Sequence, residues 1–334
     1  MQQYIIRRVL LNFFVLFLVA TMVFAALRID TDSVIRQRAG GCFGGGPGAD
    51  AQEQIRRCRE QAEVELGLDG SVPSQYWEFM SGLVQGDLGD SVVGNKDPVM
   101  GEIISRAGPS IELGLLQVFF ALLIALPVGI ISAVKQDTVI DYLLRFFSIL
   151  LLGVPVFVIA VLSILISSRY FEGSFIAEWF GPKVGYVTPG ENPYENFKIM
   201  FAPAIIGGLG TGAIIMRFLR SQMLEVLRQD YVRTAWAKGL KERVVVVRHA
   251  LKNALIPVLT IVGILLGQIV SGNVILEFIY TIPGIGNYVV FSIVQAPNFP
   301  AVQGVVIVVA AVLVFVNLLI DIAYGWLDPR IRYS

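Results

Sequence analysis

Charge is scarce in this sequence, and so are the residues that most often bind metals or carry catalysis. Only 16% of the 334 residues are charged and the formal net charge is zero, whereas a soluble domain has about a quarter charged residues. A chain without net charge has no overall field that attracts nucleic acid, so we expect no nucleic-acid partner. The chain has one histidine, His249, and two cysteines, Cys42 and Cys58. We find no convergent cluster of a nucleophile, a base or metal ligands, and we therefore predict no catalytic residue.

The sequence instead contains long runs without charged residues. Hydrophobic residues make up 55% of the chain and the mean hydropathy is +0.69. Six runs are about long enough to cross a hydrocarbon core of ~30 Å at about 1.5 Å per helical residue. They are Val9–Leu27, Leu113–Val134, Phe146–Ser168, Ile199–Met216, Ala254–Leu276 and Val302–Ile320. The first could be a cleaved signal peptide, but its apolar core is long for that role, so we predict an uncleaved anchor.

The uncharged stretch Phe278–Pro300 does not suit one straight helix. It contains Pro283, Pro297, Pro300, Gly284 and Gly286. Proline and glycine interrupt helices. We therefore predict an irregular extracytoplasmic or re-entrant segment, whose backbone is covered by protein or water.

Basic residues set the predicted orientation, because loops rich in Lys and Arg stay in the cytoplasm. Arg7 and Arg8 precede the first span, so the N-terminus is expected inside, and six spans return the C-terminus to the same side. The loop 169–198 contains four glutamates and then lies outside. His249 falls on the opposite side of the membrane from both cysteines, so we predict no metal site.

Residues 217–253, which we call the basic segment, join the fourth and fifth spans. They contain nine Lys or Arg and three acids, so the segment belongs on the cytoplasmic side. Asp230 stands where a helix N-cap would, Tyr231–Lys238 suit a short helix, and Gly239 suits its C′ position. These signals in this order predict a folded element instead of a plain tether.

Several runs in and after the basic segment carry a family resemblance. They are Met223–Leu227, Asp230–Ala235, Ala237–Leu240, Glu242 and His249–Pro257. In this order they resemble the cytoplasmic coupling loop, or EAA loop, of ABC importer permeases, and most of all its peptide/nickel branch. Trp236 stands where that family usually has arginine, and the EAA glutamate itself is absent, as is common in this branch.

Further family elements follow in the right order along the chain. They are Tyr4–Arg8, Gly86–Ser91, Asn253–Pro257, Pro283–Gly286, Phe299–Gly304 and Leu327–Arg332. The resemblance covers residues 1 to about 30 and about 66 to 334. It implies an all-α integral membrane protein with the six transmembrane helices of the type I ABC importer permease fold. The implied parts are an N-terminal helix (1–27), an extracytoplasmic insert (28–108) and a core permease domain (109–334) that contains the coupling loop.

The resemblance also implies partners and a site. A second homologous permease would share the translocation path, two cytoplasmic ABC ATPases would supply energy, and an extracytoplasmic binding protein would deliver substrate. The implied contact with the ATPase comprises Asp230, Tyr231, Arg233, Thr234, Ala235, Trp236, Ala237, Lys238 and Gly239. The expected place is the inner membrane of a prokaryote, surrounded by lipid. Family members carry di- and oligopeptides, nickel or, in some cases, sugars, and nothing in the chain selects among these.

ATP chemistry is expected in the partners and not in this chain. The nearest match to a phosphate-binding loop, Gly89–Lys96, has Asn95 where that loop needs lysine, and the ABC signature LSGGQ is absent. We therefore expect no cofactor here, with ATP and Mg²⁺ bound by the ATPases.

Two other function classes fit the sequence less well. A secondary transporter usually has ionisable residues inside its spans, but Glu112, Arg145, Glu277 and Asp321 stand at the edges of the predicted ones. A membrane enzyme or scaffold would leave the coupling loop unexplained, and an enzyme would need a reactive cluster.

The predicted insert has three parts: a glycine-rich start (40–48), a helix (49–66), and a small helix and turn (Pro73–Ser91). It is either a spacer that packs on the spans or a part that receives the binding protein. Cys42 and Cys58 both lie in it, and outside the membrane they are expected to form a disulfide. The alternative is two free buried thiols.

Proline and glycine in the spans favour a gate over a reaction site. Pro127, Pro155, Pro203 and Pro257 can kink four spans. Gly207, Gly208, Gly210 and Gly212 make one face of the fourth span thin, and Gly263, Gly267 and Ser271 form a stripe of small residues on the fifth. The stripe serves either packing within the chain or the seam with a second permease.

Overall fold

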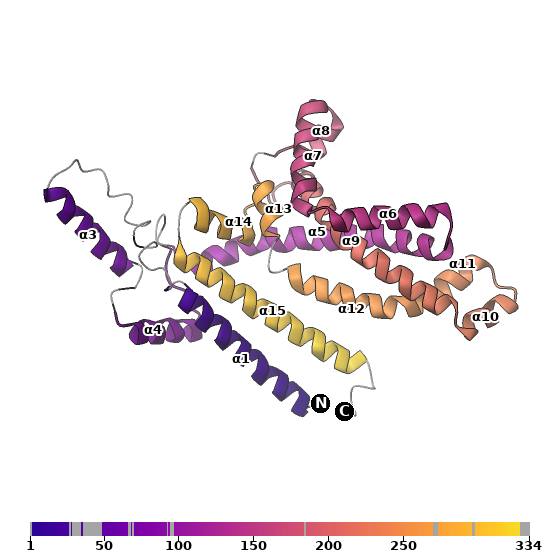
Figure 1. Cartoon of the computed structure of the whole chain (residues 1–334), viewed down its shortest axis with the longest axis horizontal. Helices are drawn as coiled ribbons and strands as arrows, with labels where there is room; N and C mark the ends of the chain where they lie inside the picture. The colour runs from indigo at the N-terminus through magenta and orange to yellow at the C-terminus, as the bar shows by residue number, and fades with distance from the viewer. Residues whose placement is uncertain are drawn as a thin grey trace. The chain divides into compact units, whose positions relative to one another are not determined.

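The computed structural model describes residues 2–26, 28, 35, 49–65, 68, 70–91, 93, 97–183, 185–269, 273–295 and 298–327. Within these ranges the structure is helical, with an isolated bridge between Asp90 and Pro98 and no β-strand (Figure 1). Five helices are long and apolar enough to cross a membrane, or six if one sharply bent pair counts as a span. The predicted all-α membrane fold is confirmed.

The chain divides into two compact units. One comprises residues 1–108 together with 285–334, and the other comprises residues 109–284. The division after Gly108 falls at the residue where the predicted insert ends, and residues 285–334 of the predicted core domain are grouped with the first unit.

In the first unit, α1 (Gln2–Ala26) and α15 (Phe299–Leu327) lie side by side (Figure 1). Helix α4 (Val72–Gln85) packs on α1 through the rings of Phe24 and Tyr76, whose centroids are 5.0 Å apart, a contact worth about 0.5–1.5 kcal/mol. The Tyr76 hydroxyl also hydrogen-bonds Thr21 at 2.8 Å. This part of the insert therefore packs on a span, which is compatible with both roles considered for the insert.

Short helices complete the first unit. Helix α3 (Ala49–Glu65) confirms the helix predicted in the insert, while the glycine-rich residues 40–48 lie outside the described residues. Helix α14 (Ile285–Val290) continues into the π-helix η3 (Phe291–Gln295). Together with α13 (Val274–Ile279) of the other unit, these short pieces confirm that Phe278–Pro300 is not one straight helix.

The second unit contains most of α5 (Val99–Val134), followed by α6 (Val139–Gly153), α7 (Val156–Tyr170), α8 (Phe175–Phe180), α9 (Pro193–Leu227) and α12 (Lys252–Ile269). Helix α9 has 35 residues, which at about 1.5 Å each makes it roughly 50 Å long. It is therefore longer than the bilayer core and extends beyond the predicted span Ile199–Met216. Its buried Leu219 and Met223 pack with Ala133 of α5 and Val258 of α12.

Three of the four glycines of the fourth span face a neighbouring helix. A methyl group at Gly208 would lie 2.8 Å from the Gln117 carbonyl oxygen of α5, and one at Gly212 would lie 3.2 Å from the Ala121 carbonyl oxygen. Gly207 is similarly close to the Gln117 side chain, whereas a methyl group at Gly210 would have no atom within 4 Å. The thin face is thus confirmed for Gly207, Gly208 and Gly212, and Gly210 points elsewhere.

The predicted third span, Phe146–Ser168, contains a sharp break. Helices α6 and α7 meet there at a bend of 97°. Val154 has extended backbone angles (φ −93°, ψ 121°), which is the conformation that a following proline favours. Pro155 therefore separates two helices, whereas Pro127, Pro203 and Pro257 lie inside continuous ones.

The fifth span also differs from the predicted Ala254–Leu276. Its helical path begins at Glu242 and runs through the π-helix η2 (Val245–Leu251) into α12, which ends at Ile269. Charged residues at the start do not stop a helix that extends past the hydrocarbon core, since their side chains reach polar surroundings. Of the small-residue stripe, a methyl group added at Gly263 would have no atom within 4 Å. Ser271 lies outside the described residues, as do the surroundings of Gly267.

Candidate functional site

The middle of the basic segment forms the short helix α10 (Asp230–Ala237). Lys238 follows as its C-cap, and Gly239 adopts φ +75° at the C′ position, as predicted. The N-terminal prediction is wrong by one residue: Gln229 is the N-cap, and Asp230 lies inside the first turn. There the Asp230 carboxylate still interacts favourably with the positive, N-terminal end of the helix dipole. In Figure 1, α10 and α11 (Glu242–Val244) lie next to each other beyond the end of α9.

The inner face of α10 holds it against the rest of the unit. Val232 is fully buried and Ala235 is 6% exposed, and both pack with Val245 of η2 and with Val226 and Leu227 at the end of α9. Residues three apart share one face of a helix. The structure therefore assigns Ala235, one of the predicted site residues, to packing within the chain, because it has almost no surface to offer a partner.

The other eight predicted site residues are exposed. They are Asp230, Tyr231, Arg233, Thr234, Trp236, Ala237, Lys238 and Gly239. Tyr231 is 45% exposed and Trp236 44% exposed, so both offer aromatic surface to a partner. The Tyr231 hydroxyl accepts a 2.7 Å hydrogen bond from Asn253, so one edge of this surface is fixed to the start of α12.

We call these eight residues the outer face of α10. It combines two aromatic side chains with Arg233 and Lys238. Arg233 lies 3.5 Å from Asp230, but both are largely exposed, and such a surface pair contributes little, roughly 0–1 kcal/mol. Aromatic and arginine side chains are enriched where protein partners bind. The outer face of α10 thus has the composition of a docking surface on a firmly packed base.

Polar residues buried elsewhere in this unit were not predicted from the sequence. Glu277, predicted at the edge of a span, is fully buried in α13 and accepts a 2.8 Å hydrogen bond from Ser110 of α5. Gln117 of α5 accepts a hydrogen bond from Asn273. A sequence shows that such residues are polar but not that the fold brings them together. The hydrogen bonds to the Glu277 carboxylate and to the Gln117 side-chain oxygen help the interior to tolerate these residues, whereas Gln117 Nε2 is buried without a partner.

A second surface lies in the segment that joins α7 to α9. Lys198 lies 2.6 Å from Glu178 of α8, and the hydrogen bond from Lys198 holds the pKa of Glu178 below its ordinary value. Tyr186 donates a 2.9 Å hydrogen bond to Glu112. Burial, and then that carboxylate, raise the pKa of Tyr186. These contacts attach the segment between α7 and α9 to α5 and to the start of α9.

The cysteines and candidate metal ligands lie only partly within the described residues. Cys58 packs with Ala62, Ile35 and Leu68, whereas Cys42 lies outside the described residues. The disulfide between Cys42 and Cys58 stays a prediction, which non-reducing peptide mapping of isolated membranes would test. Across the described ranges, no group of three or more His, Cys, Asp or Glu side chains could hold a metal ion.

Comparison with known proteins gives the family. Residues 125–333 match the binding-protein-dependent transport system inner membrane component, and residues 1–113 match the N-terminal part of such membrane components. The N-terminal match ends at residue 113, close to the division after Gly108 between the compact units, and the other begins at residue 125.

Named relatives agree with the family match. A putative peptide permease protein of Brucella suis is 36% identical over 274 residues, which cover 81% of this chain and 83% of the relative. The dipeptide transport system permease protein DppB of Escherichia coli K12 is 34% identical over 292 residues (82% and 85%). The glutathione transport system permease protein GsiC of Shigella flexneri is 32% identical over 335 residues and matches both chains over their full length. Together with the long apolar helices, these matches show that the chain is a multi-pass membrane protein of the family of binding-protein-dependent transport system inner membrane components.

Proposed function

We propose that this chain is a permease subunit of an ATP-binding-cassette importer for di- or oligopeptides, and that the outer face of α10 docks on a cytoplasmic ATPase. The observation that carries this proposal is the two-sided character of α10. Val232 and Ala235 fix the helix to its own unit, while Tyr231 and Trp236 stay exposed. A helix that only tethered two spans would not need a buried base and an aromatic outer face.

In the proposed mechanism, a movement of the ATPases is transmitted to the membrane helices through packed side chains. ATP and Mg²⁺ bind the two partner ATPases, and closure of the ATPase pair displaces α10. Because α10 packs on Val226 and Leu227 of α9 and on Val245 of η2, a displacement of α10 moves the ends of two membrane helices. The path then opens alternately to the two sides, and a binding protein delivers substrate from outside.

A second homologous permease would complete the path. On α12, Ile256 and Leu259 are 66% and 64% exposed, and a side chain at Gly263 would meet open space within this chain. We therefore assign the small-residue stripe to the seam between permeases, since small residues allow close approach of helices.

Peptides are the proposed substrates because the relatives compared above are named as peptide, dipeptide and glutathione permeases. Glutathione is itself a tripeptide, so these names describe one chemical class. Substrate choice is expected to lie largely with the binding protein.

Photocrosslinking tests the docking proposal. A photoreactive amino acid at Trp236 should crosslink to the ATPase in the assembled complex, because that side chain is exposed on the outer face of α10. The same group at Ala235, one residue away and 6% exposed, is the matched control and should give no such product. Equal crosslinking to the ATPase from both positions, or from neither, would contradict the proposed docking face.

The proposed orientation makes a separate prediction about labelling. In a variant with Cys42 and Cys58 replaced by serine, a single cysteine at Glu242 should react with an impermeant thiol reagent only from the cytoplasmic side. A single cysteine at Glu191 should react only from outside. Both positions are exposed, so access is limited by the membrane alone. Reaction of both positions from one side would refute the arrangement of spans.

A further inference from the structure

An enclosed carboxylate joins three helical elements of the second unit. Asp141, in the first turn of α6, is fully buried. Its carboxylate accepts hydrogen bonds from the Ser132 hydroxyl of α5 at 2.5 Å and from the backbone N–H of Asp137 at 3.1 Å. Arg220 of α9 donates two more, from Nε at 2.9 Å and from Nη2 at 2.8 Å. No motif in the sequence marks Asp141 and Arg220 as a pair.

The contact between Asp141 and Arg220 is a strong one. Two parallel hydrogen bonds between a guanidinium and a carboxylate fix orientation as well as distance. Arg145, one turn further along α6, approaches the same carboxylate only to 3.6 Å and stacks on Tyr142. Arg220 is therefore the main partner, and removing either member would leave the other as a buried unpaired charge.

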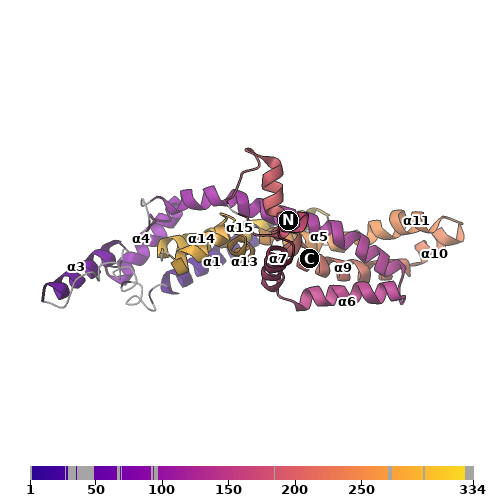
Figure 2. The same cartoon turned by 90° about the horizontal axis from the view of Figure 1, so that it is seen from above.

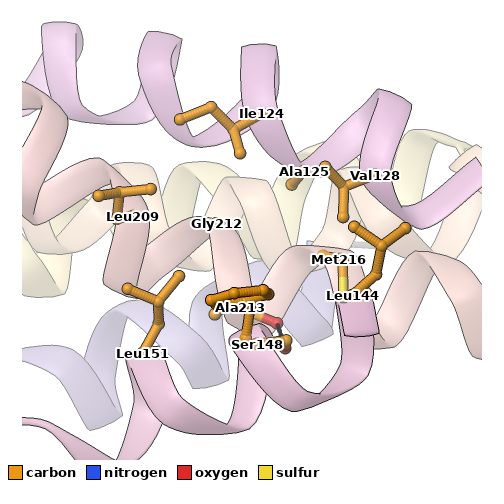
Figure 3. Close-up of a pocket in the computed structure, with 11 residues that line it drawn as sticks. Ile124, Ala125, Val128, Leu144, Ser148, Leu151, Leu209, Gly212, Ala213 and Met216 are labelled. Atoms are coloured by element: carbon orange, nitrogen blue, oxygen red, sulfur yellow. Dashed lines mark hydrogen bonds between the residues drawn. The ribbon is translucent and has the colours of Figure 1, made fainter. Parts of the chain in front are cut away.

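Close to this ion pair, the apolar packing between α6 and α9 is incomplete. A pocket of about 220 Å³ lies between them and α5, lined by side chains that include Leu144 and Leu151 of α6 and Leu209 and Met216 of α9 (Figure 3). Within the described residues, the one other side-chain hydrogen bond between α6 and α9 runs from Ser148 to the Ala213 carbonyl at 3.3 Å. The Asp141–Arg220 pair is thus the firmest specific attachment of α6 to α9.

Arg220 is also connected to α10 along α9. It lies seven residues before Leu227, which is about two helical turns, and the intervening Met223 is fully buried in the core. Leu227 in turn contacts the base of α10. In Figure 2, α6 and α9 run next to each other toward the end of the unit where α10 and α11 lie.

We propose that the Asp141–Arg220 pair makes α6 follow α9 when α10 is displaced, so that both residues are positioning residues for transport. The inference rests on the proposed docking of α10 on an ATPase. A displacement of α10 reaches α9 directly through Val226 and Leu227, and it reaches α6 through this ion pair. Without the pair, a displacement of α9 would shift it relative to α6, and α6 would not move with it.

An apolar double variant distinguishes a role of the ion pair in transport from a contribution to folding stability alone. Asp141→Leu with Arg220→Met removes both charges of the pair together, and such replacements are often neutral or stabilising. Arg145 loses its 3.6 Å contact with the carboxylate, but its side chain is 35% exposed and keeps access to polar surroundings. The reconstituted complex with its binding protein and a transported peptide should keep binding-protein-stimulated ATP hydrolysis. The amount of peptide transported per ATP should fall about tenfold, the size of a typical coupling between two sites.

Matched variants complete the test. Ser148→Ala removes the other hydrogen bond between α6 and α9 and should leave the transport-to-ATP ratio unchanged. Arg220→Lys keeps the charge but loses the double hydrogen bond, and should give an intermediate ratio. If the double variant does not assemble, Arg220→Lys and Asp141→Asn, which keeps the shape of the side chain, supply the same measurement.

A wild-type ratio in the double variant, or in both Arg220→Lys and Asp141→Asn, would overturn the role of the pair. Failure of the proposed function has a different signature, because the wild-type chain would then neither co-purify with an ATPase nor show hydrolysis stimulated by a binding protein. That result would overturn the docking of α10 and the inference together.

Discussion

Replacing Gly239 with valine should abolish ATP-driven peptide transport while the ATPases remain bound and active. Gly239 ends α10 with φ +75°, and its N–H donates a 2.9 Å hydrogen bond to the Trp236 carbonyl. No atom lies within 4 Å of a methyl group at this position, so the cost is conformational. It is roughly 1–2 kcal/mol for an L-residue in the left-handed region, and a β-branched residue is especially rare there. The turn after α10 would rearrange and displace the outer face of α10.

Gly239→Asn is the matched control. Asparagine is polar, suits this exposed turn and enters the left-handed region more readily than other side chains. It should therefore transport at close to the wild-type rate. The measurement is peptide uptake per ATP in a reconstituted complex, with co-purification of the ATPase as the check on assembly. Wild-type uptake by Gly239→Val would mean that the geometry of this turn does not matter for coupling.

A second large effect is expected where α9 passes closest to α5. Gly208→Ala places a methyl group 2.8 Å from a backbone oxygen of Gln117 and 3.0 Å from Cβ of Phe120. Backbone atoms of a neighbouring helix move little, and overpacking of this kind costs typically about 1–3 kcal/mol. The subunit should lose thermal stability and assemble poorly.

Gly210→Ala provides the comparison two residues away on the same helix. It has no atom within 4 Å of the new methyl group, and alanine favours a helix over glycine by roughly 1 kcal/mol. Melting temperatures of the two purified variants should therefore move in opposite directions. Similar melting temperatures for both would show that the approach of α9 to α5 is not as close as described.

The outline of α10 could be predicted from sequence because its signals are local. A glycine at the C′ position marks a helix end through the backbone conformation that it permits, and Gly239 adopts that conformation. The N-terminus of α10 is harder to place. The predicted N-cap, Asp230, and the observed N-cap, Gln229, are neighbours in the chain. The backbone of Gln229 has φ −71° and ψ 148°, which are not helical angles, so the helix begins only at Asp230. Helix boundaries vary by a residue or two for this reason.

Other features depend on contacts that a sequence does not display. Pro155 predicts a kink in a span, but a kink and a full break differ in how the flanking helices pack, and here the angle is 97°. Asp141 and Arg220 are 79 residues apart in the chain, so only the fold reveals their pairing. The burial of Ala235 could have been found from its spacing to Val232, since both lie on one side of a short helix.

Uptake into proteoliposomes tests the proposed import of peptides most directly. The chain, its second permease and the two ATPases would be reconstituted with ATP accessible to the ATPases and with the binding protein on the opposite side. A panel of labelled di- and oligopeptides, with nickel and a sugar as other substrate classes, would be supplied on the binding-protein side. We expect accumulation of at least one peptide that requires both ATP and the binding protein. Uptake that proceeds without ATP and is driven by an ion gradient would contradict the proposed function, as would ATP-dependent uptake of nickel or sugar with none of any peptide.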